Sequence, residues 1–179
     1  MPNGADADRD LRTLRQLLAA ATEGIDAEHF MLTHATLTGS TRRYRERVYC
    51  YELYHQLRRC WPPDFPYSLD GEPDKRNHQW FEGELSNVNP DLIIHRLGVM
   101  EHNLCAVEVK PASAKPYKLR ADITGLKLLV SPPVDYGLGI LLVYGGCRPA
   151  KLQNARTQCG ARVEVWWHEA PGIPARPVG

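Results

Sequence analysis

Three stretches of the chain repeat apolar residues every three or four positions, which is the spacing of amphipathic helices. They cover 8–21, 41–61 and 115–130, and 149–159 is a further helix candidate. Pro62 and Pro63 end the second helix, and a second pair of prolines ends the third. The stretch 22–41, which holds many threonines and glycines, gives an ambiguous pattern.

Short runs of β-branched and aliphatic residues indicate strands. The runs are 91–97, 104–110, 138–144 and 162–168, with shorter candidates at 68–72 and 79–84. The run 138–144 (LGILLVY) is continuously apolar, which is typical of a strand covered on both faces. The two ends, 1–7 and 170–179, are expected to be disordered tails because neither carries the pattern of a regular element.

The order of these elements predicts an α/β fold. The helix over 115–130 lies between two strand candidates, as it does in a parallel crossover connection. We therefore expect a mixed central sheet flanked by helices. A length of 179 residues favours a single domain that spans 1–179.

Composition narrows the class of protein. No apolar run is long enough to cross a bilayer, and the polar N-terminus lacks the pattern of a secretory signal, so a cytoplasmic protein is expected. The five cysteines are widely spaced without a CxxC pair, which argues against a zinc site and favours reduced thiols. The net charge of +1 is low for a nucleic-acid-binding protein, but acidic residues at a metal site would lower that total.

The candidate catalytic residues lie in the expected strands 91–97 and 104–110. These strands form a hairpin if the chain turns near residue 100, and in either of the two closest registers Asp91 lies opposite Glu108 or Lys110. Both registers place these three residues on one face, with Leu92, Ile94, Val107 and Val109 on the other. Two carboxylates crowded on one face favour a hard divalent cation such as Mg²⁺, beside which a lysine can orient or deprotonate water.

Pro90-Asp91, followed by Glu108-Val109-Lys110, resembles the PD-(D/E)xK nuclease superfamily. The resemblance covers about residues 44–145. It implies a restriction-endonuclease-like core, in the order helix, three-strand meander, helix and strand, here with an extra N-terminal helix. It also implies that Asp91 and Glu108 bind Mg²⁺, with Mn²⁺ able to substitute, and that Lys110 serves the attacking water. The substrate expected from the resemblance is nucleic acid, DNA rather than RNA.

Members of this superfamily often carry a further acid on the first helix, for which two residues are candidates. Glu46 falls on the apolar stripe of the helix 41–61, whereas Glu52 lies about 130° away at 100° per residue. Glu46 is favoured as the fourth catalytic residue, although an acid in a first helical turn also stabilises the helix dipole. Glu72 and Glu84 are further candidate ligands. Tyr49, Tyr51 and Tyr54 are interpreted as core and rim packing rather than as a base-stacking platform.

The function expected from these features is a Mg²⁺-dependent phosphodiesterase, most simply an endodeoxyribonuclease. The alternative is a catalytically inactive domain of the same fold that binds nucleic acid or protein. A double-strand cut by a nuclease with one site requires two sites, so a homodimer, or a partner protein for targeting, is expected. The sequence contains no GxSxG, GxGxxG or Walker motif that would indicate another hydrolase class.

Overall fold

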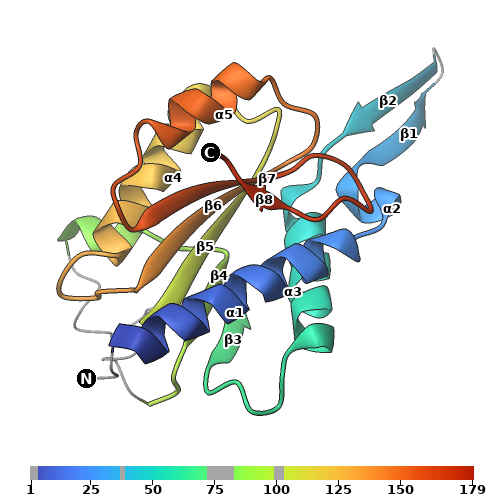
Figure 1. Cartoon of the computed structure of the whole chain (residues 1–179). Helices are drawn as coiled ribbons and strands as arrows, with labels where there is room; N and C mark the ends of the chain where they lie inside the picture. The colour runs from blue at the N-terminus through green and yellow to red at the C-terminus, as the bar shows by residue number, and fades with distance from the viewer. Residues whose placement is uncertain (1–3, 37–38, 72–82, 99–102) are drawn as a thin grey trace.

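The computed structural model describes residues 4–36, 39–71, 83–98 and 103–179. A six-stranded sheet lies at its centre, with helices on both faces (Figure 1). The strands of this sheet are, in spatial order, β3 (Ser68–Gly71), β4 (Leu92–His95), β5 (Asn103–Pro111), β6 (Leu138–Tyr144), β7 (Val163–His168) and β8 (Arg176–Pro177). The helices are α1 (Gly4–Glu23), α2 (Ala27–Phe30), α3 (Glu46–Cys60), α4 (Pro116–Leu129) and α5 (Pro149–Arg156), with a 3-10 helix η1 (Gly83–Asn87).

The sheet is mixed, as the sequence predicts. Strands β3, β4 and β5 form an antiparallel meander. Strands β5, β6 and β7 are parallel and are connected through α4 and α5, and β8 runs antiparallel to β7. The C-terminal ends of the parallel strands therefore lie along one edge of the sheet, and Lys110 lies at the C-terminal end of β5.

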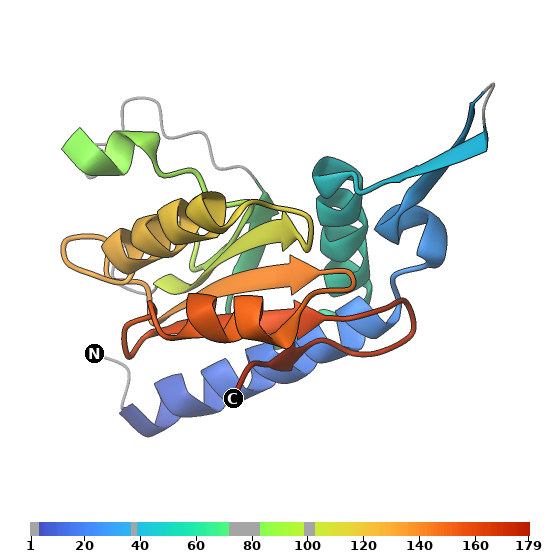
Figure 2. The ribbon, with the colours of Figure 1, turned by 90° about the horizontal axis from the view of Figure 1, so that it is seen from above.

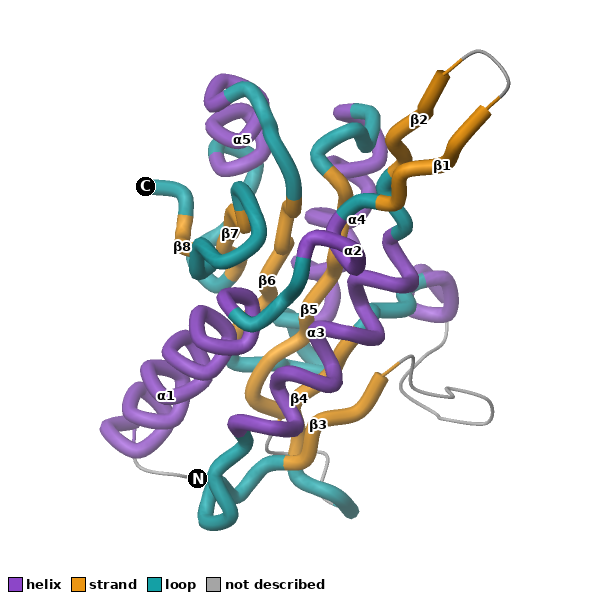
Figure 3. The backbone as a smooth tube through the Cα atoms, turned by 90° about the vertical axis from the view of Figure 1, so that its right-hand side faces the viewer, coloured by secondary structure: helices purple, strands orange, loops and turns teal. Residues whose placement is uncertain are grey.

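An apolar core covers each face of the sheet. On one face α1 and α3 pack against strand residues that include Ile94 and Val109. On the other face α4 and α5 pack against Ala106 and Leu141. Every residue of β6 is buried, which confirms that this strand is covered on both faces. The tube in Figure 3 shows α1 and α3 separated from α4 and α5 by the sheet.

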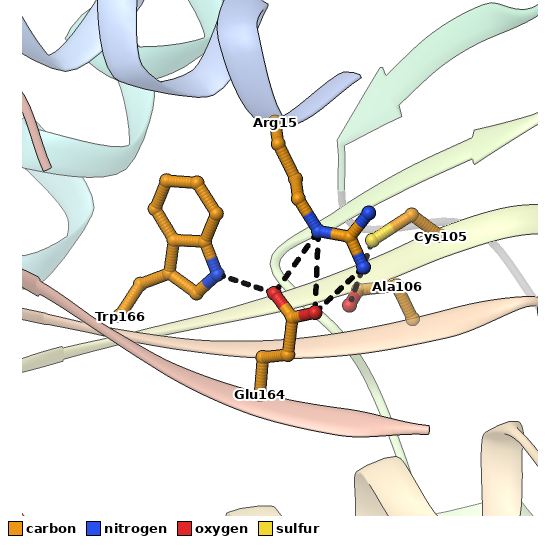
Figure 4. A network of polar contacts seen from close by, with 5 residues as sticks. All are labelled: Arg15, Cys105, Ala106, Glu164 and Trp166. Carbon is orange, nitrogen blue, oxygen red and sulfur yellow. Dashed lines mark hydrogen bonds and ion pairs between the residues drawn. The ribbon is translucent and has the colours of Figure 1, made fainter. Parts of the chain in front are cut away.

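Helix α1 is fixed to the sheet by a polar contact as well as by its leucines. Arg15 Nη2 lies 2.6 Å from Glu164 Oε1 on β7, and the indole of Trp166 donates to the other carboxylate oxygen at 2.7 Å (Figure 4). Thr22, at the end of α1, accepts a 2.8 Å hydrogen bond from the backbone N–H of Ala175. Helix α1 thus contacts both the last strands of the sheet and the C-terminal segment.

Several boundaries differ from those expected. Helix α1 already begins at Gly4, so of the expected N-terminal tail only 1–3 lie outside the described residues. The C-terminal tail is ordered: it contributes β8, and Ala175 is buried. The expected disorder was wrong for 4–7, which belong to α1, and for the C-terminal segment, whose partners on β7 and at Thr22 are distant in sequence.

The expected helix over 41–61 is also shorter, because α3 begins at Glu46. The residues before it form a hairpin of β1 (Leu32–Thr36) and β2 (Gly39–Arg43), which extends away from the rest of the described chain (Figures 1 and 2). The candidate strand 79–84 falls largely outside the described residues, and its last two positions belong to η1. All five cysteines are free thiols. None of the helices in the described part of the chain is long and apolar enough to span a membrane.

Candidate active site

The hairpin of β4 and β5 has one of the two registers expected. Leu92 pairs with Val107 and Ile94 with Cys105, a register that, continued by one residue, sets Asp91 opposite Glu108. The turn itself falls within 99–102, outside the described residues. Asp91 directly precedes β4, and its Oδ2 accepts a 2.7 Å hydrogen bond from the backbone N–H of Val109. The Asp91 carboxylate is thereby held beside β5.

Lys110 joins two of the predicted acids. Its Nζ lies 2.7 Å from Glu108 Oε1 and 3.1 Å from Glu46 Oε1, and it also donates to the carbonyl of Val109 at 3.1 Å. The side chains of Lys110 and Glu108 are only 12% and 15% exposed, whereas that of Glu46 is 40% exposed. The ammonium is therefore nearly dehydrated and depends on these oxygens as hydrogen-bond acceptors.

Glu46 and Glu52 have different surroundings. Glu46 is the first residue of α3 and reaches the end of β5 through Lys110. Glu52 instead accepts a hydrogen bond from Gln56 at 2.6 Å and lies 3.8 Å from His29 of α2. The structure thus brings Glu46, and not Glu52, to the hairpin acids. Glu72 and the side chain of Glu84 lie outside the described residues.

A fourth acid, Asp122 of α4, was missed by the sequence analysis. Its Oδ2 is buried and makes no hydrogen bond with any described residue. Electrostatic interactions link it to Lys110, Glu46 and Asp91, so it belongs to the same group. The sequence carried a signal for it, since Asp122 stands three residues after Leu119 and four before Leu126, beside the buried stripe of α4.

We call Glu46, Asp91, Glu108, Lys110 and Asp122 the acidic cluster. Burial, and then the charge of Asp91, raises the pKa of Glu108 despite the opposing effect of Lys110. Burial is also the main reason why the pKa of Asp122 rises to about 6. Desolvation lowers the pKa of Lys110, but Glu108, Asp122 and Asp91 together outweigh it and raise that pKa above its usual value. Two carboxylates thus contact one ammonium and two more act on it at longer range, so the cluster holds more acids than bases.

A cleft of about 820 Å³ opens beside the cluster, between α3 and the β3–β4 strands. Glu46 and Asp91 form part of its wall, and so do residues of both strands. Arg43, Arg45 and Arg47 flank Glu46 at the start of α3 and are exposed, and Arg47 also lines the cleft. Exposed arginines next to a cleft can contact an anionic ligand such as a phosphate.

The cluster is not arranged as a finished metal site. Among the residues that the structure describes, no group of three or more His, Cys, Asp or Glu side chains is positioned to hold a metal ion. Within the cluster the Lys110 ammonium is bonded to Glu46 and Glu108 at the same time. In comparisons with known proteins, no family model, no curated protein and no solved structure matches this chain.

Proposed function

We propose that the protein is a metal-dependent nuclease that hydrolyses phosphodiester bonds, with DNA as its principal substrate. The observation that carries this proposal is the acidic cluster: an excess of carboxylates around one buried lysine, at the edge of a cleft. The order of α3, the β3–β4–β5 meander, α4 and β6 is the order that the PD-(D/E)xK resemblance implies. It supports the assignment of a restriction-endonuclease-like core with α1 as the added helix.

The donors in the cluster fit Mg²⁺. They are carboxylate oxygens, the hard ligands that this ion prefers, and Mn²⁺ accepts the same set. Asp122 Oδ2 is buried without a hydrogen-bond partner among the described residues, and the charge of Asp91 adds to the burial that raises the pKa of Glu108. Asp91 and Glu108 would hold the ion. When bound, it would polarise the phosphodiester and lower the pKa of a water molecule.

The remaining residues have separate roles in this proposal. Lys110, which its raised pKa keeps as an ammonium, positions the attacking water through its Nζ and offsets negative charge that develops on the phosphoryl oxygens. Glu46 holds the Lys110 ammonium at the edge of the cleft, where a water molecule can reach it. The hydrogen bond from Val109 N–H keeps the Asp91 carboxylate on the hairpin face. Attack of the water oxygen forms one P–O bond while the bond to the leaving sugar oxygen breaks.

The proposal is tested by following cleavage of a supercoiled plasmid and of a labelled oligonucleotide in Mg²⁺, in Mn²⁺ and in EDTA. The wild-type protein should cleave only with metal. Lys110→Ala should lose cleavage by on the order of a hundredfold or more, as expected when a group that activates water or stabilises charge is removed. Lys127→Ala is the matched control, because this lysine is exposed on α4 and contacts none of the cluster.

Lys127→Ala should unfold at a temperature close to that of the wild type. Lys110→Ala leaves Glu108 without its ammonium partner and should unfold at a lower temperature, so cleavage is compared at a temperature at which both variants are folded. Cleavage that persists unchanged in Lys110→Ala, or that needs no metal, would contradict the proposal. An intact substrate with folded wild-type protein in both metals would support the inactive binding domain instead.

A further inference from the structure

The cleft beside the acidic cluster is large enough for part of the substrate. Its volume of about 820 Å³ lies within the range of roughly 300–1,000 Å³ that is typical of sites for small ligands. Because Glu46 and Asp91 line it, a group in the cleft lies next to the bond that the cluster would cleave. The cleft therefore contacts the substrate immediately beside the reacting phosphate.

One wall of the cleft is aromatic. Tyr51 and Tyr54 of α3 both line it and are three residues apart, so they are neighbours on one side of the helix. Tyr54 packs against the core, but Tyr51 is 63% exposed. Of the core and rim packing expected for these tyrosines, Tyr49 is fully buried in the core and Tyr51 lies exposed at the rim. An exposed ring on a cleft wall is suited to stack on a flat apolar group such as a nucleobase.

The strand wall of the cleft carries a hydrogen-bonded pair. His95 Nε2 lies 2.6 Å from Asp70 Oδ2, and the register of β3 and β4 puts both side chains on the same face of the sheet as Asp91. Both residues line the cleft, and Ile93 lies between Asp91 and His95 along β4. If Asp70 accepts from Nε2, the neutral ring presents Nδ1 as an acceptor. Such a pair can contact the polar edge of a base.

A base in a duplex cannot bind in this cleft, because its polar edge is hydrogen-bonded to the other strand and both of its faces are stacked on neighbouring bases. A duplex must first expose the base, which costs energy that a single strand does not have to supply. We propose that the cleft binds one unpaired nucleobase of the substrate strand, stacked on Tyr51, so that the protein acts on single-stranded or locally unpaired nucleic acid. This inference rests on the proposed nuclease function and narrows its substrate class.

The test measures binding by fluorescence anisotropy in Mg²⁺, on a Lys110→Ala background so that the probes stay intact. The probes are a labelled single-stranded DNA 12-mer, its RNA equivalent, the blunt DNA duplex, and a 12-mer of abasic sugars with the same charge. The single strands should bind at least tenfold more tightly than the duplex or the abasic strand. Adding Tyr51→Ala should weaken single-strand binding by on the order of tenfold, as for a lost stacking contact.

Two control variants separate stacking from general effects. Tyr51→Phe keeps the ring and should bind like the parent. Tyr117→Ala removes an exposed tyrosine of α4 that does not line the cleft, and it should leave every affinity unchanged. Tyr51→Ala should not alter binding of the abasic strand, because that strand has no base to stack. Preference for DNA over RNA, or the reverse, would identify the sugar that the cleft accepts.

The outcomes separate this inference from the nuclease proposal. Equal affinity for duplex and single strand, or single-strand binding that does not depend on Tyr51, would overturn the inference while leaving metal-dependent cleavage intact. Tyr51-dependent single-strand binding by a wild-type protein that never cleaves would overturn the nuclease proposal and retain the base-binding cleft. Absence of binding and cleavage with every probe would overturn both.

Discussion

Replacing Asp122 by asparagine tests whether the ionised carboxylate at this position costs stability in the metal-free protein. Burial raises the pKa of Asp122 from 3.8 to about 6; Glu46 and Asp91 add to the rise, and Lys110 opposes it. At 1.36 kcal/mol per pKa unit this difference corresponds to about 3 kcal/mol. Since Asp122 is only partly buried, solvent screening reduces the expected effect to about 1–2 kcal/mol.

The sign follows from where the proton binds. In the unfolded chain the carboxyl ionises near 3.8, but in the folded protein it stays protonated up to about pH 6. The free energy of unfolding therefore falls as pH rises between these values, and the loss is complete above pH 6. Asp122→Asn abolishes that loss, so the metal-free variant should be more stable than the wild type at pH 8, by about 3–6 °C in Tm. Near pH 4 the difference should vanish.

The assay is thermal and urea unfolding in EDTA at both pH values, repeated at pH 8 with millimolar Mg²⁺. Asp64→Asn is the matched control, because Asp64 is exposed and outside the cluster, and it should change little. Mg²⁺ should stabilise the wild type more than Asp122→Asn, since the variant has less charge to neutralise. If metal-free Asp122→Asn is no more stable than the wild type at pH 8, the argument that ionised Asp122 costs stability is refuted.

Three further outcomes are expected. Glu46→Gln should reduce metal-dependent cleavage by on the order of a hundredfold. Glu52→Gln, its control on the same helix, should not, and equal losses of cleavage in both variants would contradict a role for Glu46. Burial lowers the pKa of His168 from 6.5 to about 4, so its folded ring stays neutral while the unfolded ring binds a proton. Wild-type stability should therefore fall, relative to His168→Gln, by up to about 3 kcal/mol as pH drops from 6.5 to 4, and parallel pH profiles from urea unfolding would contradict this. Removal of residues 175–179 breaks the hydrogen bond from Ala175 N–H to Thr22 and should lower the free energy of unfolding by about 2 kcal/mol in urea titrations. An unchanged free energy of unfolding would show that the segment contributes nothing to stability.

The parts of the fold that the sequence predicted are those with a strong local period. The continuous apolar run of β6 could only be a strand buried on both faces, and it begins and ends at the residues expected. The alternation around Asp91 and Glu108 fixed the face of the hairpin, because a change of register by two residues leaves side chains on the same face. The three candidate catalytic residues of the hairpin could therefore be grouped without knowledge of the turn.

The parts that were missed depend on distant partners. Strand β8 has two residues and no period of its own, and it forms because β7 offers an edge. The β1–β2 hairpin has little apolar alternation, so the helix expected over 41–61 wrongly included the end of β2. Asp122 was missed because it stands beside the apolar stripe of α4 and has no partner nearby in sequence. A carboxylate at the edge of a buried stripe nevertheless requires a compensating partner.

The central claim, that Asp91 and Glu108 bind a divalent metal, is tested most directly by a crystal soaked in Mn²⁺ and measured at a wavelength where manganese scatters anomalously. The account predicts an anomalous peak roughly 2.1 Å from an oxygen of each carboxylate, with the Lys110 ammonium moved away from Glu108 toward the cleft. An ordered cluster without a peak, in which Lys110 still bridges Glu46 and Glu108 at millimolar Mn²⁺, would contradict it.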